Sequence, residues 1–269
     1  MNKREQKMLD ILRKGREEFG YVGVKAEFEA EGTRTDELLR LMEIARKADL
    51  DVGLKIGGCE AVRDLIESKQ FGVEFIIAPM IETSYALSKF IDAKNKVYST
   101  EEQMNTEFLY NLETETAFQN RLSLFEKATA NTGVNGVVFG RVDYAMSRNI
   151  SRENINASSI TASAETVAKM CTEHQQDLVV GGGISEESIP VLQMLRNIHL
   201  TRFETRKIIF SSDSLTLAND AVKSGLLQAV HFELLWLQNK REYYRVIETE
   251  DEKRIEMLEA RWNVLGSAM

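Results

Sequence analysis

Eight short apolar runs alternate with amphipathic segments, and this alternation restricts the fold more than any other feature of the sequence. In segments such as "TDELLRLMEIARKA", apolar residues recur every three or four positions, as on the buried face of a helix. Strands that alternate with such helices form parallel sheets with crossover connections. The pattern predicts one α/β domain over residues 1–269, a (β/α)8 TIM barrel, in preference to an open doubly wound sheet. The expected strands are residues 21–30, 51–58, 73–80, 96–99, 107–114, 135–141, 177–183 and 206–212.

Two further segments lie outside the eight units. Residues 1–19 are expected to form an N-terminal helix, and residues 215–262 C-terminal helices that pack on the barrel or on a neighbouring subunit. The segment "AVHFELLWLQNKREYY" carries a large apolar face for one outer helix, which includes Phe232, Trp236 and Tyr243.

The charge balance excludes several classes of partner. Acidic residues number 42 and basic residues 34, a formal net charge of -8, and no basic cluster stands apart from helical faces. Nucleic acid is therefore not an expected partner.

No apolar run approaches the length of a membrane span, so no membrane association is expected. Cys59 and Cys171 lack the spacing of a metal or disulfide motif, and reduced thiols in a cytoplasm are expected.

A barrel of this type has its active site at the carboxyl ends of its strands. Glu113 ends the strand in "EFLYNLETETAF", and Asp143 follows the next strand in "VVFGRVDYAMS". Two carboxylates at neighbouring strand ends can share one hard cation, and oxygen-only ligation favours Mg²⁺ or Mn²⁺. The alternative is that Glu113 caps the following helix and Asp143 closes a turn.

These segments resemble the HpcH/HpaI aldolase / citrate lyase beta family. The resemblance lies in "YNLETETAFQN" followed by "GVNGVVFGRVDYAMS", with "VEFIIAPMIETSYAL" and "GLKIGGCEAVRDLIESKQFG" in register before them. It covers roughly residues 20–215 and implies a phosphoenolpyruvate/pyruvate-type barrel. It also implies that Glu113 and Asp143 are metal ligands, and that the backbone near Gly140, Val142 and Asp143 receives a substrate carboxylate. Terminal helices shared between subunits, and hence a homo-oligomer, are a further implication.

Two departures from the family pattern affect the chemistry. Lys55 stands where the family has a pyruvate-binding Arg, so one charge remains but the bidentate fork is lost. The first strand ends Glu27-Phe28-Glu29-Ala30, without the family's acid/base histidine. Glu27, Glu29, Glu31 or a metal-bound water then has to move the proton, and carboxylates crowded together would have a raised pKa. The alternative is that Glu27 or Glu29 forms a salt bridge with Lys25, Lys55 or Arg34 at the barrel mouth.

Several other strand-end residues have two interpretations each. Lys55 either neutralises a carboxylate or forms a Schiff base with a carbonyl substrate. Gly181, Gly182 and Gly183 either bind an anion or form a tight turn. Glu82 either reaches the pocket or starts a helix. The remaining strand-end set either touches substrate or caps the last helix, and consists of Ser211, Ser212 and Asp213. His174, His199 and His231 are expected on the surface.

Together these observations predict a metal-dependent carbon–carbon lyase of aldolase type that acts on a 2-oxo acid or pyruvate-derived substrate. One alternative is an acyl-CoA lyase similar to citrate lyase beta. Another is a catalytically reduced barrel that binds a carboxylate or serves as a scaffold.

Overall fold

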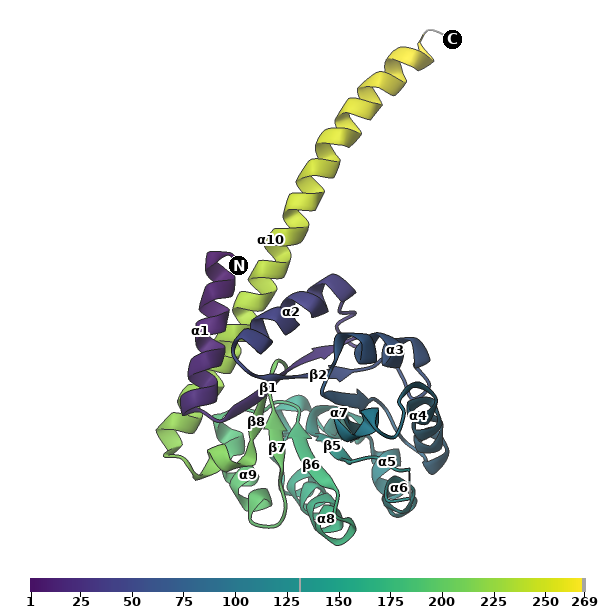
Figure 1. The fold of residues 1–269 in the computed structure, drawn as a ribbon. Coiled ribbons are helices and arrows are strands. Elements are labelled where there is room, and N and C mark those ends of the chain that lie inside the picture. Colours follow the sequence, from purple (N-terminus) through teal and green to yellow (C-terminus); the bar gives the residue numbers. More distant parts are fainter. Residues whose placement is uncertain (131, 268–269) are drawn as a thin grey trace.

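The computed structural model describes residues 1–130 and 132–267 and contains a closed barrel of eight strands (Figure 1). Each strand pairs with its neighbours in sequence order, and β8 closes the barrel on β1. The (β/α)8 barrel predicted from the sequence is confirmed in this respect. The strands are β1 Tyr21–Glu27, β2 Asp51–Lys55, β3 Phe75–Ala78, β4 Glu107–Leu112, β5 Gly136–Gly140, β6 Asp177–Gly181, β7 Arg202–Glu204 and β8 Ile208–Ser211.

The last strand departs from the predicted parallel pattern. Strands β1 to β7 run parallel, but β8 pairs antiparallel with both β7 and β1. A turn over residues 205–207 joins β7 to β8, so no crossover helix separates these two strands. Because β8 is reversed, its first residues lie at the mouth, the end where the other seven strands finish. Its last residues lie at the opposite end, the bottom of the barrel.

Two strand assignments from the sequence were wrong. Residues 96–99, predicted as a strand, lie at the end of helix α4 (Ser84–Val97). The apolar spacing of α4 continues to Tyr98, whose buried ring packs edge-on against Phe108 at 5.0 Å between centroids. Strand β7 was missed, because its three residues carry two charges and merge with the expected strand at 206–212.

The helices cover the outside of the barrel (Figure 1). Helix α1 begins with a capping box, in which the Asn2 side chain accepts from Glu5 N and the Glu5 side chain accepts from Asn2 N. Helix α3 ends at Gly72, whose φ of 74° suits glycine. The other helices alternate with the strands. Besides α4, the α-helices are α1 Lys3–Glu18, α2 Thr35–Lys47, α3 Val62–Phe71, α5 Glu115–Gln119, α6 Arg121–Ala128, α7 Arg141–Ser147, α8 Ser158–His174, α9 Ile189–Arg196 and α10 Asn219–Gly266.

The interior of the barrel consists of three layers. The middle layer is apolar and is formed by Phe75, Ile77, Leu109, Val138, Val179 and Ile209. Below it, Arg202 bonds Glu107 at 2.5 Å and Asp177 at 3.4 Å. Above it lie charged side chains of the mouth. Because side chains of a strand alternate between its two faces, Leu109, Asn111 and Glu113 lead from the middle layer to the mouth.

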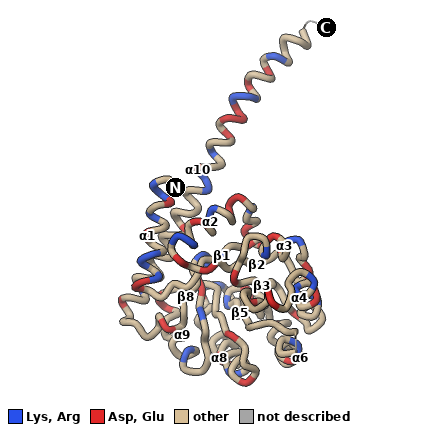
Figure 2. Tube along the Cα trace, in the orientation of Figure 1, with Lys and Arg blue, Asp and Glu red and all other residues tan. Residues whose placement is uncertain are grey.

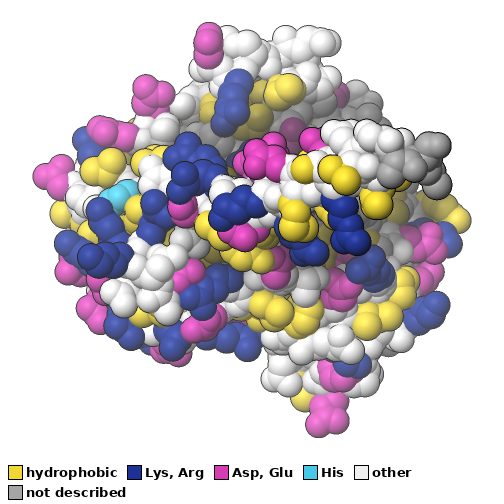
Figure 3. Space-filling model, turned by 90° about the horizontal axis from the view of Figure 1, so that it is seen from above, with side chains coloured by type: hydrophobic (Ala, Val, Ile, Leu, Met, Phe, Trp, Pro, Cys, Tyr) yellow, Lys and Arg dark blue, Asp and Glu magenta, His cyan; other side chains and the backbone are white. Residues whose placement is uncertain are grey.

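Helix α10 has two parts that differ in their surroundings. Its first turns pack on the barrel and on α1 and bury Phe232 and Trp236. Its last turns project far from the barrel and are exposed throughout (Figures 1 and 2). None of the helices among the described residues is long and apolar enough to cross a membrane. Basic, acidic and apolar side chains are interspersed across the face drawn in Figure 3.

Candidate active site

Glu113 follows β4 directly and points into the mouth, with only 2% of its surface exposed. Its side chain lies over Gly140 at the end of β5, where an added Cβ would come within 2.8 Å of Glu113 Cβ and 3.0 Å of its Oε2. A side chain at position 140 would therefore displace Glu113. Glycine at this position lets the carboxylate lean toward the neighbouring strand.

Three donors hold the Glu113 carboxylate. Met80 N donates to Oε1 at 2.9 Å, while Asn111 Nδ2 and Lys55 Nζ donate to Oε2 at 2.5 and 3.3 Å. Met80 has a φ of 51°, in the left-handed region that non-glycine residues seldom adopt. Glu113 thus does not cap a helix: Thr114 caps α5 by accepting from Ala117 N.

Lys55, the last residue of β2, lies between two carboxylates. Its Nζ is 3.2 Å from Glu29 and 3.3 Å from Glu113, and its side chain is 10% exposed. Burial lowers its pKa, but the charges of Glu113 and Glu29 outweigh burial and raise the pKa on balance. Lys55 is therefore an ammonium at neutral pH, which disfavours the Schiff-base interpretation because that route needs a neutral amine.

Asp143 lies in the first turn of α7, at the rim of the mouth, and is exposed to solvent. Partial burial raises its pKa, and the nearby charge of Glu113 raises it further. Among the described residues its carboxylate makes no hydrogen bond or salt bridge. Val142 precedes it, and amides in a first helical turn have no partner within the helix.

A second group of charges in the mouth contains two residues that were not predicted from the sequence, Glu204 and Lys207. Lys25 is ion-paired with Glu204 and lies 3.3 Å from Glu27, and Lys207 is ion-paired with Glu31. Lys207 comes from the β7–β8 turn and Glu204 from β7, so both depend on the strand that was missed. Their sequence signal is the polar interruption "ETRK" inside an otherwise apolar run.

The raised pKa predicted for the crowded first-strand glutamates was wrong for Glu27. Burial raises its pKa, but Lys25 and Lys55 lower the pKa on balance. The salt-bridge interpretation describes both first-strand residues, since Glu27 pairs with Lys25 and Glu29 with Lys55. Glu29 is the more accessible of the two, with 30% of its side chain exposed against 10% for Glu27.

The mouth carries an excess of negative charge. Ion pairs link five carboxylates with four cations, and Asp143 adds a sixth carboxylate. The acidic set is Glu27, Glu29, Glu31, Glu113, Asp143 and Glu204, and the basic set is Lys25, Lys55, Arg206 and Lys207. Six negative against four positive charges leave a net charge of -2 for this set. A cation entering the mouth is favoured electrostatically.

The donor atoms fit a hard divalent cation that is partly coordinated by water. No group of three or more His, Cys, Asp and Glu side chains able to hold a metal is present within residues 1–130 and 132–267. Glu113 accepts three hydrogen bonds, which leaves one of its roughly four lone-pair sites, on Oε1. Beside Glu113, Asn111 Oδ1 is buried and has no hydrogen-bond donor among the described residues. Glu113 and Asp143 could thus supply two ligands to Mg²⁺ or Mn²⁺.

The glycine run at the end of β6 forms a tight turn against α7. Gly182 and Gly183 have φ of 84° and 61°, and a Cβ at Gly182 would lie 2.7 Å from Val142 N. Arg141 donates to the carbonyl oxygens of both glycines, at 3.0 and 3.1 Å. Burial lowers the pKa of Arg141 to about 10. This geometry fits the interpretation as a tight turn. The glycine carbonyls point toward the Arg141 guanidinium. Gly181 lies beside Glu204.

The remaining candidates lie away from the mouth or cap helices. Ser211 and Ser212 are at the bottom of the barrel, where Ser211 N donates to Gly20 O, so their placement at an active-site rim was wrong. The cause is the reversed β8. The alternative that they cap the last helix was also wrong: Ser211 accepts from Asp213 N and caps the 3-10 helix Ser212–Thr216, whereas α10 begins after Ala218 without a side-chain cap. Glu82 accepts from Thr114 Oγ1 at 2.8 Å.

The histidines do not supply the missing acid/base group. His174 ends α8 near Phe125, His199 bonds Gln176 O, and His231 lies on α10. Among the described residues, none of these rings lies in the mouth.

Comparison with known proteins gives a result for the fold. No family model matches the sequence, and no curated protein sequence matches it. Solved structures do match. An HpcH/HpaI aldolase from Desulfitobacterium hafniense has a TM-score of 0.57 at 12% identity, over 73% of this chain and 82% of that chain.

Two other solved structures agree with this result. An HpcH/HpaI aldolase/citrate lyase family protein from Burkholderia cenocepacia has a TM-score of 0.60 at 12% identity, over 84% of this chain and 90% of that chain. A variant of the citrate synthase SbnG has a TM-score of 0.55 at 14% identity, over 74% and 81% of the two chains. The chain therefore has the barrel fold of the HpcH/HpaI aldolase and citrate lyase structures that its sequence resembles.

Proposed function

We propose that this protein is a divalent-metal-dependent carbon–carbon lyase of aldolase type, which acts on a 2-oxo acid such as a pyruvate derivative. The observation that carries the proposal is the meeting of Glu113, Asp143, Lys55 and Glu29 at the mouth of the barrel. The family resemblance and the shared fold support it. Mg²⁺ or Mn²⁺ held by Glu113 and Asp143 would supply Lewis-acid polarisation of the substrate carbonyl.

The residues of this chain have distinct roles in that reaction. Lys55, kept as an ammonium by its two carboxylates, provides the positive charge that accompanies the substrate carboxylate. Amides near Val142 and Asp143 orient that carboxylate beside Gly140. Glu29 accepts the proton, because it is the more accessible first-strand glutamate, while Glu27 is held as a carboxylate by Lys25.

Exchange of the methyl protons of pyruvate in deuterated buffer tests the proposal, because it needs a polarised carbonyl and a base but no aldehyde partner. We expect Mn²⁺- or Mg²⁺-dependent exchange in the wild type and its loss in Glu113→Ala. Calorimetry with Mn²⁺ should show loss of binding in Glu113→Ala combined with Asp143→Ala. Asp92→Ala with Glu126→Ala is the matched control, because both carboxylates are exposed and remote.

A barrel that binds a carboxylate without turnover is the second candidate. The contact between Lys55 and Glu113 favours it, since the ammonium already balances part of the charge that a metal would balance. Binding of oxalate without any metal-dependent proton exchange would support this candidate and contradict the lyase.

A further inference from the structure

The outer face of α10 carries a heptad pattern, which the rest of the chain contacts at Tyr244, whose hydroxyl donates to Glu37 of α2. From Leu227 to Leu265, positions at alternating spacings of three and four residues form a seam along the helix. Its twelve residues are Leu227, Val230, Leu234, Leu237, Arg241, Tyr244, Glu248, Asp251, Ile255, Leu258, Trp262 and Leu265. Nine of the twelve are apolar or aromatic. This spacing is that of a coiled coil, in which a second helix covers the seam.

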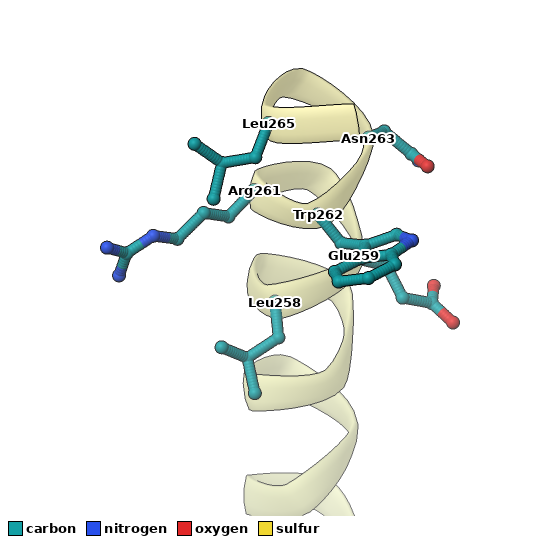
Figure 4. A pocket seen from close by; sticks show the side chains of 6 residues that line it. All are labelled: Leu258, Glu259, Arg261, Trp262, Asn263 and Leu265. Carbon is teal, nitrogen blue, oxygen red and sulfur yellow. The ribbon is translucent and has the colours of Figure 1, made fainter. Parts of the chain in front are cut away.

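The apolar residues of the seam face solvent. The exposed fraction lies between 48% and 76% for Leu227, Val230, Leu234 and Leu237 near the barrel and for Ile255, Leu258, Trp262 and Leu265 near the tip. Figure 4 shows Leu258 and Leu265 on the same side of the last turns. Exposed apolar residues at regular spacing along roughly 57 Å of helix, at 1.5 Å per residue, indicate a surface that another helix covers.

We propose that a second copy of this chain covers the seam, and that the two α10 helices run antiparallel. We place the two helices in the register in which each seam residue lies opposite a seam residue of the partner helix and the two residue numbers add to 492. The apolar layers are Leu227 with Leu265, Val230 with Trp262, Leu234 with Leu258, and Leu237 with Ile255. Every apolar residue near the barrel thereby meets an apolar residue near the tip of the other copy.

The polar interruptions of the seam determine the direction of the helices. In the antiparallel register Arg241 meets Asp251, and Tyr244 meets Glu248. In a parallel pair the same positions would place Arg241 against Arg241, Glu248 against Glu248 and Asp251 against Asp251. Like charges that face each other in a buried seam repel, so the parallel arrangement is energetically disfavoured. Among the described residues, Arg241 and Asp251 make no salt bridge within the chain, which leaves both charges for a partner.

The flanking positions agree with this register. Ile247 meets Ile247 of the second copy at the two-fold axis, as a self-complementary interface requires. The flanking pairs of like charge are Lys240 with Arg254 and Arg245 with Arg245. Lys240 is already bonded to Glu37 at 3.1 Å, and Arg245 to Glu242 at 2.6 Å. The charges that would repel are thus balanced within each chain.

The antiparallel register has a consequence for the arrangement of the two barrels. The tip of each helix lies along the first turns of the other and so beside the partner's barrel, and the two barrels lie at opposite ends of the helix pair. Leu227 and Leu234 contribute to the seam from turns that also pack on the barrel through the opposite face, which buries Phe232. The projecting turns of α10 gain contacts along their whole length.

Sedimentation equilibrium on the 269-residue chain tests the self-association. We expect a dimer for the wild type and about a hundredfold or greater weakening in Leu234→Glu combined with Leu258→Glu, since two core layers are lost per dimer. Both side chains are about half exposed in the single chain, so its folding is not affected. The matched control is Val246→Glu with Val264→Glu, at exposed positions outside the seam, and should remain dimeric. A wild type that is monomeric at every concentration would overturn the proposal, and so would a dimer that survives both substitutions in the seam.

A charge exchange tests the direction of the helices. Arg241→Glu and Asp251→Arg should each weaken the dimer, because each places like charges opposite one another. The two together should restore the wild-type dimer in the antiparallel register. Failure of the double variant to recover, with both single variants weakened, would contradict this register.

Disulfide trapping provides an independent test in a Cys59→Ser background, since Cys171 is buried. Leu237→Cys and Ile255→Cys should each remain uncrosslinked alone and form a covalent dimer when mixed. A parallel dimer would instead crosslink each variant with itself, which would overturn the antiparallel proposal. Neither outcome depends on metal binding or proton exchange in the barrel.

Discussion

The two ends of the barrel interior both carry ion pairs, but they differ in where the carboxylates lie. At the bottom, Arg202 is 10% exposed while its partners Glu107 and Asp177 remain 36% and 35% exposed. At the mouth, three of the six carboxylates are buried, those of Glu27, Glu113 and Glu204, and Glu113 is only 2% exposed. Water can stabilise the bottom carboxylates, whereas the charge of the mouth has to be balanced by the chain's own cations or by a bound ion. The comparison shows that one end closes the barrel and the other keeps charge available for a ligand.

The largest effect is expected at Lys55. Lys55→Met leaves the buried Glu113 without its cation, and we expect the free energy of unfolding to fall by about 3 kcal/mol and metal-dependent exchange to disappear. Urea denaturation measures the first effect. Lys169→Met, at an exposed lysine of α8, is the control and should change stability very little. A Lys55→Met variant as stable as the wild type would show that the mouth needs no internal cation.

A smaller loss is expected at the bottom. Arg202→Met removes a guanidinium that stacks 4.5 Å from the Phe75 ring and bonds two carboxylates. Because both carboxylates reach water, the expected cost is about 2 kcal/mol of unfolding free energy. Mn²⁺ affinity, measured by calorimetry, should not change. A clear loss of Mn²⁺ binding in this variant would mean that the two ends are not independent.

The next effect is a dependence of stability on pH. It is expected for Lys94, which has no carboxylate partner, and not for Lys55, which has two. Lys94 donates to the carbonyls of Thr132 and Gly133 on the bottom side, and burial lowers its pKa to about 8 from 10.5. Between these values the unfolded chain binds more protons than the folded chain, so stability rises with pH. We expect a gain of about 1–2 kcal/mol between pH 8 and pH 9.5, absent in Lys94→Met. Identical pH profiles for the two proteins would contradict this assignment. Lys55, whose pKa is raised, stays charged over that range.

The smallest effect is the difference between the two first-strand glutamates. Glu29→Gln should slow pyruvate proton exchange about tenfold, because it removes the accessible base. Glu27→Gln should change the rate less, since Glu27 is paired with Lys25 and its pKa is lowered. Exchange rates from proton NMR decide between them. The reverse order would identify Glu27 as the base.

Much of the fold could be predicted from the sequence, because a strand followed by an amphipathic helix leaves a clear pattern in each repeat. The prediction failed at β7 and β8, which are not connected by a crossover helix. Strand β7 is three residues long, and a turn of three residues separates it from β8, so no helix period marks the boundary.

The candidate site was predictable to the extent that it depends on parallel strands. Glu113, Lys55 and Glu29 follow strands or end them, and the structure brings them within ion-pair distance. Lys207 and Glu204 could not be placed, because the direction of the last strand decides which end of the barrel they reach. The contact of Met80 N with Glu113 was also hidden, since a positive φ at a methionine has no sequence signature.

The reversed last strand also affects the order in which the protein can fold. Strands β1 to β7 can be added one after another through local contacts, whereas the pairing of β8 with β1 joins segments at opposite ends of the barrel sequence and carries the larger loop-closure entropy. The same closure brings Lys207 to Glu31 and Glu204 to Lys25. A partly folded chain that lacks this last pairing also lacks two of the ion pairs that shape the mouth. These two ion pairs of the mouth are therefore completed only at the step that completes the barrel.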